Sequence, residues 1–96
     1  MSGIVPPNLV FSPRSRLKPG TLRVIHSFAG WSLAIGVWDT NKALLIRWDG
    51  DPDRPLGNPV SRGYPTWFVL PEELHEAALE KVPDSAKRAE AASWLG

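Results

Sequence analysis

The fold is decided by residues 21–48, which read TLRVIHSF-AG-WSLAIGVW-DTNK-ALLIRW. In residues 21–28 and again in 31–38, apolar side chains alternate with polar or small ones, which is the period of a half-buried β-strand. The short stretches between the apolar runs are rich in turn-forming residues. We therefore predict three consecutive strands over 21–28, 31–38 and 43–48, joined into an antiparallel sheet.

The alternation also assigns faces to these strands. Leu33, Ile35 and Leu45 are the residues that we expect in the core. Ser32, Ala34 and Gly36 make one face of the second strand small, so another backbone or a helix can approach it closely. Residues 43–48 are apolar on both faces, which indicates burial on both sides. A second layer supplied by a homodimer partner is one explanation.

The flanking segments complete the predicted domain. Residues 1–20 form an extended proline-rich arm, in which Asn8 to Phe11 can dock as an edge strand and the basic stretch around Arg14 and Arg16 is exposed. The expected remainder is a long loop over 50–63, a fourth strand over 64–70 and two short helices within 71–96. Pro83 separates the helices, and Asp84 or Ser85 can cap the second one.

Composition sets limits on the class of protein. The 96 residues suit one domain of α+β class, with a small twisted antiparallel sheet or half-barrel of three to five strands followed by two C-terminal helices. The chain has no cysteine, which excludes disulfides and thiol chemistry. It shows neither a membrane-spanning run nor a secretion signal, so we expect a soluble cytoplasmic protein without membrane contact. Residues 1–70 carry a net charge of +4 and residues 71–96 one of −3.

Few residues suggest catalysis or metal binding. Asp49, Asp51 and Asp53 alternate in the loop, but the calcium-loop spacing fails, so we read them as turn-forming, solvated residues and expect no metal. His26 is a weak catalytic candidate because it lies on the apolar side of its predicted strand. His75, on the first predicted helix, is a weaker one. No phosphate loop or dinucleotide motif is present, and we expect no cofactor.

Tryptophan is the strongest indication of a binding surface, because five of the 96 residues are tryptophan. Trp31 and Trp94 are expected to be structural, whereas Trp38, Trp48 and Trp67 are the ones expected to be partly exposed. Arginine beside aromatic rings is typical of protein hot spots and of nucleic-acid sites. The candidate binding residues in and beside the loop are Arg47, Trp48, Arg54, Arg62, Tyr64 and Trp67.

These residues favour a non-enzymatic module that binds a macromolecular partner, protein before nucleic acid, through an aromatic and arginine-bearing loop surface. A phage or mobile-element inhibitor of a host protein is one form of this reading. The alternative is a small ribonuclease-like enzyme or toxin that uses His26 with Arg47 and Arg62. A third reading is structural, because Arg54 and Arg62 can hold their own loop by hydrogen bonds. An enzyme requires histidine and arginine to converge in one pocket, whereas a binding module requires only an exposed patch.

Overall fold

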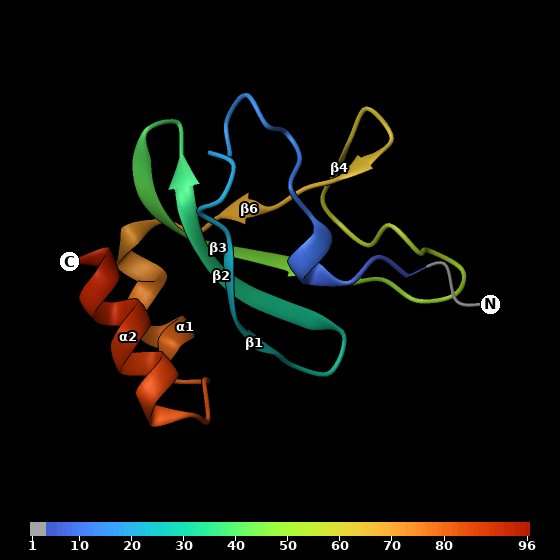
Figure 1. Cartoon of the computed structure of the whole chain (residues 1–96). Helices are drawn as coiled ribbons and strands as arrows, with labels where there is room; N and C mark the ends of the chain where they lie inside the picture. The colour runs from blue at the N-terminus through green and yellow to red at the C-terminus, as the bar shows by residue number, and fades with distance from the viewer. Residues whose placement is uncertain (1–3) are drawn as a thin grey trace.

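The computed structural model describes residues 4–96, which form a four-stranded antiparallel sheet with two C-terminal helices on one face (Figure 1). The first three residues of the predicted arm lie outside the described residues. The order across the sheet is β1 (Arg23–Ser27), β2 (Trp31–Trp38), β3 (Asn41–Trp48) and β6 (Phe68–Val69). A separate hairpin contains β4 (Val60–Ser61) and β5 (Tyr64–Pro65). The predicted α+β class is confirmed.

β2 and β3 form the centre of the sheet. Their register is continuous from the pair Trp31–Trp48 to the pair Trp38–Asn41. The turn between them is Asp39-Thr40, with positive φ of 49° and 70°. Two positive φ angles twist a hairpin in the sense that its strands require. The turn is therefore tighter than the predicted 39–42, and β3 begins two residues earlier than expected.

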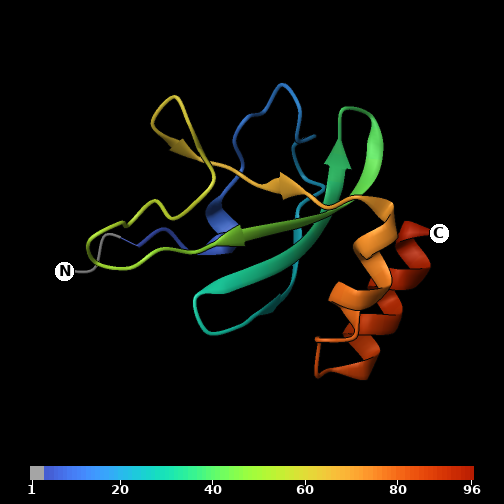
Figure 2. The same cartoon turned by 180° about the vertical axis from the view of Figure 1, so that it is seen from behind.

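The helices cover one face of the sheet, which we call the helix face (Figure 2). Leu33 and Ile35 are 0% and 3% exposed there, as predicted. Trp31 and Trp94 pack at the margin of the same cluster, which supports the structural role expected for both. The buried residues of this cluster are Ile25, Leu33, Ile35, Leu44, Leu79, Val82 and Ala91.

The N-terminal arm covers the opposite face, which we call the arm face. Leu17 inserts over Gly36, where a Cβ would lie 2.9 Å from the Leu17 methyl carbon. The arm also adds backbone hydrogen bonds to the end of β2, from Lys18 N to the Val37 carbonyl and from Asp39 N to the Arg16 carbonyl, each 2.8 Å. The chain thus supplies its own second layer, and the two-sided burial of β3 no longer argues for a dimer partner. The buried residues here are Val10, Leu17, Ala34, Ala43, Leu45 and Trp67.

Two predicted strands have other structures. The expected edge strand at 8–11 is replaced by a single 3₁₀ turn, η1 (Pro7–Leu9). The expected strand over 64–70 is interrupted at Thr66 and Trp67, because both side chains bind the arm. The Thr66 hydroxyl donates to the Ser12 carbonyl at 2.6 Å, and Trp67 Nε1 donates to the Val10 carbonyl at 2.8 Å.

The C-terminal segment begins with η2 (Glu72–Leu74) and α1 (His75–Leu79), which together are shorter than the helix predicted from residue 71. α2 (Ser85–Leu95) begins as expected, because the Asp84 carboxylate accepts from Ala86 N at 2.9 Å and Lys87 N at 3.1 Å. In residues 4–96, no helix combines the length and apolar character needed to cross a membrane.

Candidate functional site

Arg47 is the structural anchor of the long loop. Its side chain is completely buried on the arm face. Arginine is one of the residues least often found fully buried in proteins. The guanidinium donates to the carbonyl oxygens of Leu56 and Thr66, and Nη1 also lies 3.5 Å from the Pro59 carbonyl oxygen. Pro59 and Thr66 flank the β4–β5 hairpin, so Arg47 ties together both ends of its base. Arg47 therefore supports the loop from within, and the prediction that it belongs to an exposed contact surface is wrong.

A buried polar network continues from Arg47. Its Nε lies 3.9 Å from Asp49 Oδ1, and the Ser32 hydroxyl donates to Asp49 Oδ2 at 2.7 Å. Burial lowers the pKa of the Arg47 guanidinium, and the nearby Asp49 carboxylate opposes this by favouring the charged form. Asp49 is thus half-buried and bound, contrary to the expectation of a solvated turn residue. Asp51 does form a turn, because its carboxylate accepts from Asp53 N and Arg54 N.

An aromatic groove opens where the helix face extends beyond the helices. Trp48 is 60% exposed and Phe68 is 56% exposed. The register places them on the same face as Trp31 and Ile46, because Trp48 pairs with Trp31 and Phe68 pairs with Ile46. Figure 2 shows β3 running away from the helices towards this end. The groove encloses about 230 Å³ and is lined by Trp31, Ile46, Arg47, Trp48, Asn58, Pro59 and Phe68.

The groove has a fixed outer wall. Trp48 and Asn58 exchange both backbone hydrogen bonds, at 2.8 and 3.0 Å. Pro59 follows directly, and its carbonyl accepts from Thr66 N at 3.0 Å as well as lying beside Arg47. The exposed aromatic rings are therefore presented on a surface whose backbone is held in place from within.

The β4–β5 hairpin beside this wall carries two of the other predicted binding residues. Arg62 lies at its tip with φ of +52°, followed by Gly63 at +80°. Tyr64 is 64% exposed and Val60 is 44% exposed. Arg54 lies in the preceding turn and is also exposed. Trp67, by contrast, is 2% exposed, so the expectation of an exposed Trp67 was wrong.

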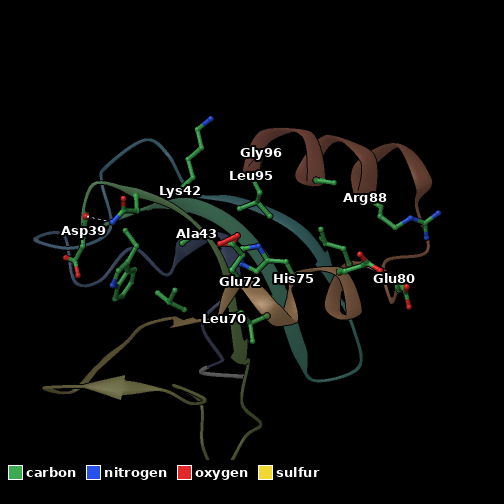
Figure 3. A pocket seen from close by; sticks show the side chains of 16 residues that line it. Asp39, Lys42, Ala43, Leu70, Glu72, His75, Glu80, Arg88, Leu95 and Gly96 are labelled. Carbon is green, nitrogen blue, oxygen red and sulfur yellow. Dashed lines mark hydrogen bonds between the residues drawn. The ribbon is translucent and has the colours of Figure 1, made fainter.

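A larger hollow, of about 750 Å³, lies at the other end of the helix face, between the β2–β3 turn and the two helices (Figure 3). Its cations already have partners in the chain. Arg88 Nη1 donates to the Val82 carbonyl at 2.9 Å, and Lys42 Nζ lies 5.2 Å from the centre of the Trp94 ring. Figure 3 shows these two cations directed outward at different ends of the hollow. The titratable residues of the lining are Asp39, Lys42, Glu72, His75, Glu76, Glu80 and Arg88.

The predicted catalytic combination is not assembled. His26 pairs with Leu33 in the sheet and contacts the Phe28 ring edge-on, with 4.5 Å between the ring centres. Arg47 pairs with Ser32, one residue along β2 and therefore on the opposite face. The Arg47 guanidinium is also occupied by carbonyl oxygens, which leaves it unsuited to stabilise a phosphate.

Sequence reasoning missed Phe68, Asn58 and Pro59, and placed Trp31 only in the core. The usable signal was the alternation in β3, since Ile46 and Trp48 share a face. The exposed part of the groove is formed by the rings of Trp48 and Phe68.

Comparison with known protein families, with curated proteins and with solved structures finds no match to this chain.

Proposed function

We propose that this protein is a non-enzymatic binding module that engages a protein partner through the aromatic groove. The observation that carries the proposal is the exposure of Trp48 and Phe68 on the same face of the sheet, next to Trp31 and Ile46, on a surface whose backbone is fixed by Arg47. Exposed aromatic side chains on a fixed backbone are typical anchors of protein interfaces, because they bury a large apolar area at a small cost in backbone entropy.

The charge near the groove favours a protein over a nucleic acid. Arg47 is the charged residue among those that line the groove, and its side chain lies buried on the arm face, on the other side of the sheet. The neighbouring loop carries Asp51 and Asp53 beside Arg54, so its charges oppose one another. A polyanion is normally bound by unpaired lysines and arginines along its backbone. Arg54 and Arg62 are rim residues in this proposal, and rim charges affect association rate more than affinity.

Site-specific photo-crosslinking in cells of the native host tests the proposal. A benzophenone amino acid at position 68 reports on the groove, and the same group at position 74 is the matched control, since Leu74 is 49% exposed outside the groove. We expect a discrete protein adduct from position 68 that is absent from position 74 and is lost when Trp48→Ala is added. Adducts of equal strength at both positions, or none at position 68, would contradict the proposal.

The same experiment separates the nucleic-acid reading. Nuclease treatment leaves a protein adduct unchanged, whereas an adduct to RNA or DNA collapses to the size of the free chain. Binding to nucleic acid would also weaken steeply with salt and lose part of that dependence in the Arg54→Ala/Arg62→Ala double variant. We expect neither behaviour.

A further inference from the structure

The groove is smaller than the pockets that hold drug-sized ligands. Drug-sized ligands and cofactors occupy pockets of roughly 300–1,000 Å³ that bury most of their surface. This groove, at about 230 Å³, is open along one side and suits one or two side chains of a longer chain that runs across it. The groove lies on the face of the sheet, where a ligand contacts side chains. It does not lie along a strand edge, where an added strand would pair through backbone hydrogen bonds.

Hydrogen-bond chemistry narrows the kind of chain that fits. Within residues 4–96 the indole of Trp67 donates to the Val10 carbonyl, whereas the Nε1–H of Trp48, a residue that is 60% exposed, donates to no group of the chain and can bind an outside acceptor. The exposed side-chain amide of Asn58 stands in the same lining. The groove therefore combines apolar rings with donor groups.

A proline-rich segment complements these properties. Proline has no N–H, so its backbone offers only carbonyl acceptors, and the polyproline II helix leaves those carbonyls without internal partners. Its rings are apolar and pack on flat aromatic faces, and it arrives already ordered, so little entropy is lost on binding. It also carries no charge, which matches a groove whose exposed side chains are uncharged, because the Arg47 side chain is buried on the arm face.

We infer that the groove binds a proline-rich segment of the partner in the polyproline II conformation. The rings of Trp48 and Phe68 flank the bound prolines, and the Trp48 indole N–H donates to a backbone carbonyl of the segment. This inference rests on the proposed function, because it names the chemistry of the partner at the same groove.

Titration of the ¹⁵N-labelled protein with a ten-residue oligoproline peptide tests the inference, and a Gly-Ser peptide of equal length serves as the control ligand. The chain has five tryptophans, and single Trp→Phe variants assign their indole N–H signals. We expect a saturable shift of the Trp48 indole signal with oligoproline and none with the control. The Trp67 indole signal should stay in place, because its N–H is bound to Val10.

Variants then test the contacts. Trp48→Ala should weaken oligoproline binding more than about tenfold, as expected for a central aromatic anchor. Trp48→Phe keeps a ring but removes the donor, and should weaken binding about fivefold, the effect of one hydrogen bond. Leu74→Ala is the control variant and should bind like the parent chain.

The outcomes distinguish the inference from the proposed function. If oligoproline fails to bind while position 68 still crosslinks to a protein, the proline assignment is wrong and the binding module stands. If oligoproline binds but Trp48→Ala has no effect, proline recognition lies elsewhere and the inference is equally overturned. If neither oligoproline nor any protein engages the groove, both the inference and the proposed function fail.

Discussion

The two ends of the helix face differ in how they are covered. At one end Ile35 is 3% exposed beneath the helices, and at the other Phe68 is 56% exposed on the same face of the same sheet. The difference follows from where the helices lie. Figure 2 shows both helices beside one end of the sheet, while β3 (Asn41–Trp48) runs away from them. The part of the helix face beyond the helices is left uncovered and becomes the groove.

Removing α2, which covers one end of the helix face, should lower the stability of the fold more than any other change. Deleting residues 83–96 takes away α2, and with it Ala91, Trp94 and Leu95 from the helix-face cluster. We expect the thermal midpoint to fall by more than about 10 °C, the scale that applies when several kcal/mol are lost from a domain of this size. Calorimetry measures it. An unchanged midpoint would mean that α2 does not close this end and that Trp94 is itself a candidate contact for a partner.

Arg47 supports the uncovered end of the sheet, and its loss should lower the free energy of unfolding almost as much. Arg47→Met removes the donors to Leu56, Pro59 and Thr66 and leaves Asp49 without its cation. We expect a loss of about 3–5 kcal/mol in the free energy of unfolding, typical of breaking a buried polar cluster on one side. Urea denaturation measures the loss. The control is Arg62→Met at the exposed hairpin tip, which should change stability by less than about 0.5 kcal/mol.

Two substitutions compare the stability that the covered and the uncovered end of the helix face contribute. Ile35→Ala should cost about 2–5 kcal/mol, because it removes buried methyl groups and leaves a cavity. Phe68→Ala should cost less than about 1 kcal/mol, because most of its ring already faces water. Chemical denaturation of both variants tests the contrast. Equal losses would show that the open end contributes to the core as much as the covered one.

The smallest expected loss of stability comes from removing the N-cap of α2. Asp84→Ala removes the side-chain acceptor for two backbone N–H groups at the start of α2. We expect a loss of about 1 kcal/mol, the usual contribution of an N-cap. Asp53→Ala, on an exposed loop residue, is the matched control and should stay within about 0.5 kcal/mol of the parent. A loss at position 53 equal to that at position 84 would contradict the capping role.

Local patterns predicted the elements whose structure depends on near neighbours. Alternation over 31–38 identified β2 and its faces, and Asp84 marked the start of α2. The two-sided apolar character of β3 correctly indicated a second layer. Its source was missed because Val10 and Leu17 reach the sheet from an arm with no periodicity of its own.

Features that depend on distant contacts escaped prediction. Arginine is usually a surface residue, and the burial of Arg47 depends on the carbonyl groups of residues 56, 59 and 66, which the fold brings together. Trp67 belonged to an aromatic run that suits a strand, yet its indole is turned inward to Val10. The candidate site was therefore found in part: Trp48 is where it was expected, whereas Arg47 and Trp67 support the structure from inside.

The contacts of the arm also affect the order in which the parts of the chain fold. Trp67 binds Val10 across 57 positions, and Thr66 binds Ser12 across 54. A ribosome adds about 5–20 residues each second, so the arm is made several seconds before its partners on the arm face exist. Contacts between distant positions also form slowly, because a long loop must close first. The arm, although it is synthesised before its partners, is thus among the last segments to reach its final place. Until then Leu45 and Ala34 lack their cover, so a newborn chain exposes an apolar surface that the finished protein conceals.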